Sequence, residues 1–282
     1  MTRRTVSLFV MLLVSMATLL GGPTGARAIT YGYVDSANTY SNTGALVVQA
    51  PSGGRNYPFC SGTLISPTVF LTASHCTVYY TGELAPLGYR LYVSFDGAIP
   101  FGESTSRNTN LVPVAQVVSN PNYPGPESDS GDIAVVLINA TSKTRRIAPA
   151  ALPGAGQLDG LAADNGLKDA VFTAVGYGLQ NRVVGGGTPT FTDANPAPRM
   201  YAFSSFNALG PGYLRLSQNP ATGNGGTCFG DSGGPNFLDV NGKPVLVAIT
   251  ITGDAVCRST NVDYRLDIPS ARSFLAPYIP LP

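Results

Sequence analysis

Short apolar runs, separated by turn-forming residues, recur along most of the chain. The runs are rich in Val, Ile, Thr, Tyr and Phe, which favour strands. The pattern predicts strands at 45–49, 62–65, 69–72, 90–95, 112–118, 133–138, 170–176, 199–203, 212–216, 244–252 and 262–266. Only 270–278 has a helical pattern. Many short strands with few helices are typical of a barrel or a sandwich, so we predict an all-β fold.

The composition agrees with one large β domain or two small ones. Of the 282 residues, 44% are hydrophobic and 12% are charged, which is too apolar for a disordered protein. The 33 glycines and 23 prolines are scattered, as expected for a chain with many turns. From about 141 to 168 the strands give way to an Ala-, Gly- and Pro-rich stretch, which predicts a connection between two halves.

The first 28 residues have the pattern of a secretory signal. Arg3 and Arg4 precede an apolar run over 6–20, and small residues two apart end the segment at Ala28. A membrane anchor is the alternative, but this run of 15 residues is shorter than the ~20 that span a bilayer. We therefore expect a signal peptide at 1–28 and a secreted mature chain at 29–282, which is not attached to a membrane.

The charge balance argues against polyanionic partners. The formal net charge is +1, and removal of 1–28 takes away three arginines and no acid. The mature chain then has no basic excess, so we expect no nucleic-acid or anionic-lipid partner.

Four cysteines in an exported chain suggest two disulfides. Three pairings are possible, of which local pairing of 60 with 76 and of 228 with 257 is the simplest. A zinc site is the competing interpretation, but the chain has no Cys-x-x-Cys and a single histidine. We predict no metal and no cofactor.

The segment 230–235, Gly-Asp-Ser-Gly-Gly-Pro, is the sharpest local feature. A serine nucleophile needs an adjacent base and backbone N–H groups that hold the oxyanion, and glycines allow the required close approach. By itself the segment is equally compatible with a glycine-rich turn. His75 is the only histidine, and so the only imidazole base that Ser232 could use.

A Gly-x-Ser-x-Gly segment also occurs in α/β-hydrolases. In that fold the histidine follows the serine, whereas no histidine follows Ser232 here. The alternating helices of that fold are also missing from the pattern.

A carboxylate should orient the imidazole, and Asp132 is the candidate. It begins the apolar run 132–138, where a buried carboxylate is costly unless it is paired. Asp129 lies nearby in a Ser- and Gly-rich stretch that is typical of a solvated loop. The alternative for Asp132 is a turn residue that caps a strand.

These segments together resemble the motifs of chymotrypsin-like (trypsin-like) serine peptidases. The motifs, in that family's order, are 72–76 with the histidine, 132–135 with the aspartate and 230–235 with the serine. The third matches residue for residue, and the resemblance covers nearly all of 29–282.

The resemblance implies two six-stranded antiparallel β-barrels with the active site between them and a short C-terminal helix. The first barrel would take about 29–140 and the second about 169–282, with 141–168 as the connection. We expect a monomer. The implied disulfides are Cys60–Cys76, beside the histidine, and Cys228–Cys257, beside the serine.

The resemblance also implies a role for each site residue. Ser232 would attack the scissile carbonyl, His75 would carry its proton, and Asp132 would orient the imidazole. The N–H groups of Gly230 and Ser232 would form the oxyanion hole. Asp231 would pair with a free apolar N-terminus, which the predicted signal cleavage creates at Ile29.

The specificity pocket departs from the family's pattern. Gly226, six residues before the serine, occupies the position at the bottom of the pocket, so no acid stands there. We therefore expect apolar or small substrate side chains and no preference for basic ones, although Asp254 could reach the pocket. The substrate-pairing segment contains Thr252 and Gly253, without the usual Ser and Trp.

The sequence thus predicts a secreted serine endopeptidase that hydrolyses protein or peptide substrates through an acyl-enzyme. Two alternatives stay open. One is a secreted binding protein on the same fold whose catalysis is weak or lost, since fold alone does not give function. The other is a secreted esterase with the same triad.

Overall fold

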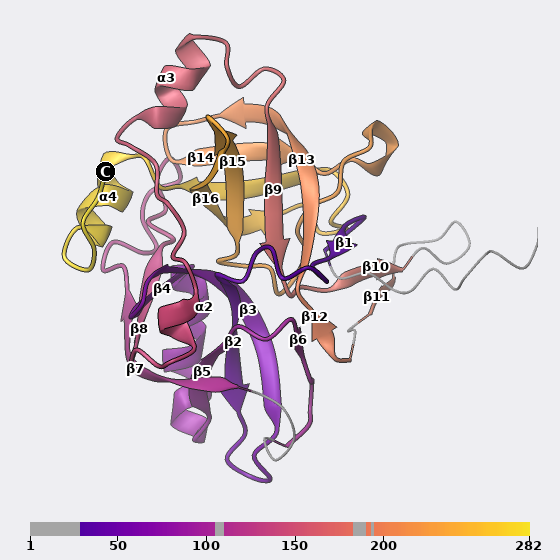
Figure 1. Ribbon diagram of the computed structural model, residues 1–282, viewed down its shortest axis with the longest axis vertical. Coiled ribbons are helices and arrows are strands. Elements are labelled where there is room, and N and C mark those ends of the chain that lie inside the picture. The colour runs from indigo at the N-terminus through magenta and orange to yellow at the C-terminus, as the bar shows by residue number, and fades with distance from the viewer. Residues whose placement is uncertain (1–28, 105–109, 183–189, 193–194) are drawn as a thin grey trace, which may run out of the picture.

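Two groups of six strands close into barrels, which lie one above the other in the computed structural model of the protein (Figure 1). The structure describes residues 29–104, 110–182, 190–192 and 195–282. The predicted signal peptide therefore lies outside the described residues. Among the described residues, no helix has the length and apolar character needed to cross a membrane.

The first barrel has the strand order β2-β3-β4-β8-β7-β5, with every neighbouring pair antiparallel. Its interior is filled by aliphatic and aromatic side chains, with Phe70 fully buried. A Cβ at Gly62 would lie 2.4 Å from the Phe70 ring, so this strand position needs glycine. The strands are β2 (Thr43–Gln49), β3 (Asn56–Ser66), β4 (Val69–Thr72), β5 (Arg90–Ser94), β7 (Leu111–Ser119) and β8 (Ala134–Ile138).

The second barrel has the order β13-β14-β17-β16-β15-β9, and pairing of β9 with β13 closes it. A short strand, β1 (Tyr33–Val34), pairs with Met200 and Tyr201 at the start of β13, ahead of the part of β13 that pairs with β14. Leucine and phenylalanine side chains fill the interior, together with Leu158 from a helix in the connection. The strands are β9 (Val171–Gly176), β13 (Met200–Leu209), β14 (Tyr213–Ser217), β15 (Pro235–Val240), β16 (Lys243–Gly253) and β17 (Thr260–Arg265).

The remaining elements are short. The helices are α2 (Ser74–Tyr79), η1 (Tyr80–Leu84), η2 (Ala85–Leu87), η3 (Thr144–Arg146), α3 (Gln157–Ala163), η4 (Pro220–Thr222) and α4 (Pro269–Leu275). The small strands are β6 (Ala98–Ile99) with β12 (Ala197–Pro198), and β10 (Gln180–Arg182) with β11 (Thr190–Thr192).

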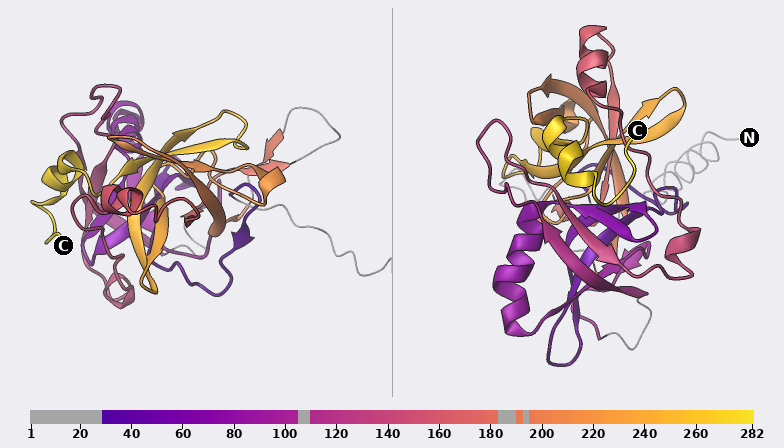
Figure 2. Two further views of the ribbon diagram at one scale, coloured as in Figure 1. Left: turned by 90° about the horizontal axis from the view of Figure 1, so that it is seen from above. Right: turned by 90° about the vertical axis from the view of Figure 1, so that its left-hand side faces the viewer.

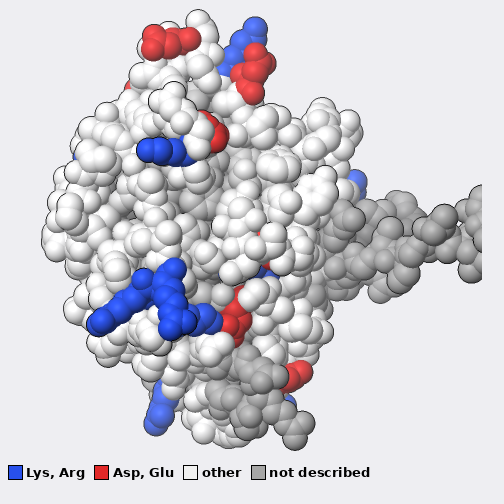
Figure 3. Space-filling view, in the orientation of Figure 1, with Lys and Arg blue, Asp and Glu red and all other residues white. Residues whose placement is uncertain are grey.

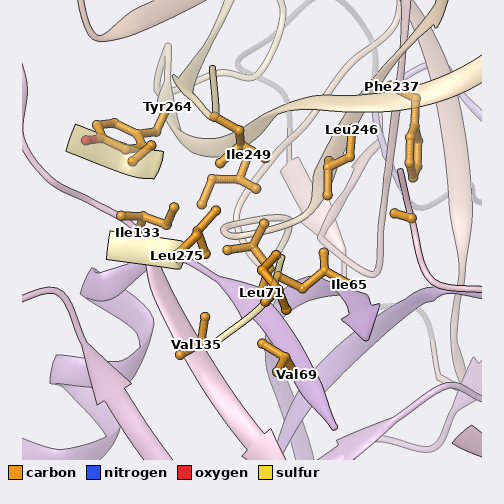
Figure 4. Close-up of a cluster of buried hydrophobic side chains, with 14 of the residues drawn as sticks. Ile65, Val69, Leu71, Ile133, Val135, Phe237, Leu246, Ile249, Tyr264 and Leu275 are labelled. Carbon is orange, nitrogen blue, oxygen red and sulfur yellow. The ribbon is translucent and has the colours of Figure 1, made fainter. Parts of the chain in front are cut away.

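A hydrophobic cluster joins the two barrels. Figure 4 shows side chains of β3, β4 and β8 facing side chains of β15, β16 and β17. Leu275 of α4 is part of the same cluster, so the C-terminal helix returns to the seam between the barrels (Figure 2). Burial of this shared apolar surface holds the barrels in a fixed relation, which any site between them requires.

The prediction of two six-stranded antiparallel barrels is confirmed. The structure also contains both expected disulfides, Cys60–Cys76 and Cys228–Cys257. Several elements differ from the prediction, among them the helix α3 and the small strands β6, β10, β11 and β12, which were not predicted. The pattern missed β15, which begins at a proline, and it missed α2, which has only six residues. The segment from residue 29 was assigned to the first barrel, whereas β1 pairs with the second.

A buried ion pair fixes the N-terminal segment against both barrels. Arg199 is fully buried, and its Nε donates to Asp35 Oδ2 at 2.8 Å. The Asp35 carboxylate also accepts the backbone N–H groups of Thr39 and Tyr40. The other acceptors of the guanidinium are Asn38 Oδ1, the Tyr177 hydroxyl and the carbonyl oxygens of Thr43 and Phe95.

We predict that Arg199→Met destabilises the protein by about 3–5 kcal/mol, because it leaves the Asp35 carboxylate buried without a cation. The double variant Asp35→Asn/Arg199→Met should lose less than the sum of the two single variants, since neither charge then remains. Urea unfolding of the four proteins measures this. Strict additivity of the two losses would contradict the interpretation.

Candidate active site

The backbone places His75 and Asp132 together at the end of the first barrel. His75 lies in the first turn of α2, directly after β4, and Asp132 comes just before β8, which pairs with β4. His75 Nδ1 is 2.8 Å from Asp132 Oδ2, and the His75 backbone N–H donates to Asp132 Oδ1 at 2.9 Å. Both carboxylate oxygens are thus engaged by one residue, which fixes the ring and directs Nε2 away from Asp132.

Ser74 holds this arrangement in place, and sequence reasoning missed it. The Ser74 hydroxyl is buried, donates to the Ile133 carbonyl at 2.7 Å and accepts the Asn120 N–H at 3.0 Å. Ser74 and Ile133 are the chain neighbours of the paired histidine and aspartate. The bond therefore fastens the two segments directly beside the ion pair.

Ser232 lies across the seam from His75, beside the Cys60–Cys76 disulfide. Its carbonyl oxygen accepts the Ser61 N–H at 2.8 Å and lies 3.8 Å from Cys76 Sγ. A ring nitrogen of His75 and the sulfurs of this disulfide all lie within 4.8 Å of one another. The described residues include no direct hydrogen bond between the His75 ring and the Ser232 hydroxyl; such bonds are often long in free enzymes.

The turn that contains Ser232 has two glycines in the left-handed region, Gly230 with φ 95° and Gly233 with φ 79°. The Gly230 carbonyl accepts a hydrogen bond from the Ser61 hydroxyl at 3.0 Å, which fixes the orientation of the peptide group that contains this carbonyl. The N–H groups of Gly230 and Ser232 have no acceptor among the described residues. They are therefore available to bind a substrate oxygen at this turn. Ser61, which sequence reasoning also missed, links β3 of the first barrel to this turn.

Asp231 is fully buried behind the turn. Its Oδ1 accepts the Gly178 N–H and its Oδ2 accepts the Cys228 N–H, each at 2.8 Å. Burial outweighs these two hydrogen bonds and raises the pKa of Asp231 to about 7. Among the described residues, no cationic group pairs with this carboxylate.

Ile29 is brought close to this region, although no contact joins it to Asp231 among the described residues. Its side chain is fully buried against Met200 and Ala202 of β13. Met200 pairs with Gly176 of β9, and the Asp231 carboxylate packs against Gly176. The next residue, Thr30, pairs through its backbone with Gly226.

A pocket of about 250 Å³ opens beside Ser232. Thr252, Gly253 and Asp254 line it, as the sequence suggested. Gly226 does not line it; a Cβ there would lie 2.2 Å from Gln218 Oε1, so the Gln218 side chain occupies the space beside this glycine. The other lining residues are Thr227, Cys228, Phe229, Thr250, Ile251, Ala255 and Cys257.

Among the described residues, one group has potential ligand atoms close enough together to hold a metal ion, and it consists of Cys60, His75 and Cys76. Both sulfurs are in the disulfide, so neither is a thiolate that could bind a metal. With both sulfurs in a disulfide, this group cannot bind a metal ion through its cysteines.

Comparison with known proteins identifies the family. The model of the Trypsin family matches residues 34–274, and the chain belongs to that family. The chain is also similar to a CLIP domain-containing serine protease, B15, of Anopheles gambiae, with 27% identity over 233 residues. The match covers 77% of this chain and 60% of that protein, so the chain spans less than two thirds of that relative's length. The resemblance to chymotrypsin-like peptidases is thus confirmed.

Gly176→Ala tests the packing behind the serine turn. A Cβ there would lie 2.1 Å from Asp231 Oδ1, so the turn must shift, and we predict a loss of about 1–3 kcal/mol. Gly160→Ala in α3 is the matched control, because its Cβ would meet nothing within 4 Å and alanine favours a helix. Thermal unfolding should separate the two variants; equal melting temperatures would show that Gly176 is not constrained.

Proposed function

We propose that this member of the trypsin family is a serine endopeptidase with His75, Asp132 and Ser232 as its catalytic residues. The observation that carries the proposal is the His75 ring, which is 2.8 Å from Asp132, while the next residue, Cys76, lies 3.8 Å from the Ser232 carbonyl oxygen. The two N–H groups of that turn without an acceptor among the described residues support an oxyanion hole made by Gly230 and Ser232.

In the proposed mechanism, Ser232 Oγ attacks the scissile carbonyl while its proton passes to His75 Nε2. Asp132 stabilises the resulting imidazolium through Nδ1, and the N–H groups of Gly230 and Ser232 hold the negative oxygen. The C–N bond then breaks as Nε2 gives its proton to the leaving amine. Water attacks the acyl-enzyme, loses a proton to His75, and Ser232 is released with that proton.

We also propose that the protein is secreted, with 1–28 as its signal peptide and 29–282 as its peptidase domain. Two disulfides support this, because such bonds persist in oxidising compartments. Protein or peptide substrates follow from the proposed activity. The face shown in Figure 3 carries one compact group of Lys and Arg side chains and several separate charged groups of both signs.

The first test is labelling by a fluorophosphonate, which reacts with an activated serine. The protein should be labelled at Ser232, and Ser232→Ala should abolish labelling. Asp132→Asn should slow it by several orders of magnitude, because the ring loses its orientation and its charge partner. Ser142→Ala, at an exposed serine, is the control and should label normally.

Labelling that persists in Ser232→Ala would contradict the proposed nucleophile. An unlabelled but folded protein would favour the inactive binding protein. A labelled protein that cleaves esters but not the matched peptides would favour the esterase.

The proposed role of Ile29 is to supply the ammonium group that Asp231 lacks. Ile29 packs on β13 beside the strand that carries Gly176, so a short movement of a free N-terminus would bring the two groups together. An ammonium beside Asp231 would favour its ionised form and lower its pKa.

This role predicts a difference in stability with pH between two forms of the Ser232→Ala protein. In a form with a two-residue extension before Ile29, the pKa of Asp231 is raised to about 7, so the stability it contributes is present at low pH and lost as the pH rises towards 7. The form that begins at Ile29 should lack most of this loss. Asp231→Asn should remove the loss from the extended form. Equal pH dependence in all three proteins, measured by urea unfolding from pH 4.5 to 8, would refute the pairing.

A further inference from the structure

Two tyrosines of the second barrel reach the loop that leads to Asp132. Tyr213 of β14 and Tyr264 of β17 lie directly opposite each other in the sheet, with ring centres 6.3 Å apart. Tyr264 is fully buried in the cluster that joins the barrels, and Tyr213 packs against that cluster. The Tyr264 hydroxyl donates to Asp129 Oδ1 at 2.6 Å, and the Tyr213 hydroxyl accepts the Ser130 N–H at 2.8 Å. Two adjacent residues of the loop between β7 and β8 are thus bound by two paired strands of the second barrel.

The proton of the Tyr264 hydroxyl goes to Asp129. A hydroxyl has one proton and an ionised carboxylate can only accept, so the Ser270 hydroxyl, 3.2 Å away, donates to Tyr264. Burial raises the pKa of Tyr264, and the bond to Asp129 raises it further, so the phenol keeps its proton. A distance of 2.6 Å is typical of a hydroxyl that donates to a charged oxygen, which is a strong kind of hydrogen bond. Asp129, which the sequence suggested to lie in a solvated loop, is partly buried.

The residues between Asp129 and Asp132 form a tight turn. Asp129 Oδ1 also accepts the Gly131 N–H at 3.3 Å, and Gly131 lies in the left-handed region with φ 64°. The Gly131 carbonyl accepts the Ile133 N–H at 2.8 Å and the Asn120 side-chain amide at 3.0 Å. Because the backbone on both sides of Asp132 is bound, a displacement of Asp129 is transmitted through this turn to the Asp132 carboxylate.

The backbone of the second barrel also comes close to this loop. A Cβ at Gly212, the residue before Tyr213, would lie 2.6 Å from the Ser128 carbonyl oxygen, so this approach needs glycine. The approach brings the Tyr213 hydroxyl within hydrogen-bond distance of Ser130. The loop is therefore packed against the second barrel as well as bonded to it.

We propose that the hydroxyls of Tyr213 and Tyr264 position the Asp132 carboxylate, and that the orientation of the imidazole depends on them. The inference rests on the proposed peptidase function. The two tyrosines touch neither His75 nor Ser232 in the described hydrogen bonds, so they are positioning residues that act through Asp132. Because the serine turn belongs to the second barrel, the two hydroxyls align the Asp132–His75 pair with the barrel that carries Ser232.

The test compares peptide hydrolysis by Tyr264→Phe, Tyr213→Phe and the double variant. Phenylalanine keeps each ring in the cluster and removes only the hydroxyl. We expect kcat to fall about tenfold in each single variant with KM unchanged, because a small misplacement of a catalytic group is costly. The double variant should lose more than either single variant. Tyr40→Phe is the matched control and should keep the wild-type kcat, because Tyr40 packs against the same cluster but its hydroxyl bonds to Thr173.

Substitution of Asp129 separates the hydrogen bond from the charge. Asp129→Asn keeps an oxygen that accepts from Tyr264, so its kcat should stay close to that of the wild type. Asp129→Ala has no acceptor and should behave as Tyr264→Phe does. A loss in Asp129→Asn as large as that in Asp132→Asn would contradict the proposal, because Asp129 would then act through its charge.

Nitrogen-15 NMR of the only histidine, in the Ser232→Ala protein, separates this inference from the proposed function. Tyr264→Phe should make the His75 Nδ1 proton exchange with water severalfold faster, and Tyr40→Phe should not. Faster exchange in Tyr264→Phe, for a protein that hydrolyses no peptide, would sink the peptidase and keep the positioning role. Hydrolysis with wild-type kcat and wild-type exchange in the tyrosine variants, or with a change in KM alone, would overturn the positioning role and keep the peptidase.

Discussion

The contact between the Asp132 carboxylate and His75 is the interaction on which the site depends. One oxygen meets the imidazole and the other meets the backbone N–H of the same residue, so the ring can neither swing away nor turn over without losing a charge-assisted bond. The carboxylate is nearly buried, with 8% of its side chain exposed, whereas the imidazole is 30% exposed. The aspartate is thus held inside the first barrel, and the ring is presented at the surface where the second barrel meets it.

The second requirement is a close and rigid seam between the barrels. The hydrophobic cluster that the barrels share makes the seam rigid. Ser61 fixes the position of the serine turn against the first barrel. Its backbone N–H, its hydroxyl and its carbonyl bind Ser232, Gly230 and Thr72 in turn. A Cβ at Gly233 would lie 2.2 Å from Thr72 Oγ1, so the serine turn can approach the first barrel only with glycine there. The glycines of the motif therefore act on tertiary packing as well as on the local turn.

The sequence predicted what local pattern and motif spacing can encode. Alternating apolar runs indicated most strands, and the segments around His75, Asp132 and Ser232 indicated the candidate site. It could not predict Ser74 or Ser61, because a serine before a histidine and a serine within a strand have no local signal; their roles arise from partners 59 and 169 residues away. The pocket shows the same limit. The sequence placed Gly226 at the bottom of the pocket, whereas the Gln218 side chain occupies the space beside this glycine, a contact that has no local signal in the sequence.

Because His75 is the only histidine in the chain, nitrogen-15 NMR of histidine-labelled protein reports on this one imidazole. At a pH where the ring is neutral, we expect a proton on Nδ1, shared with Asp132 and protected from exchange, and an unprotonated Nε2 that can accept from Ser232. In Asp132→Asn this signature should be lost. A wild-type ring that carries its proton on Nε2, or that exchanges freely between the two tautomers, would contradict the proposed role of the Asp132–His75 pair.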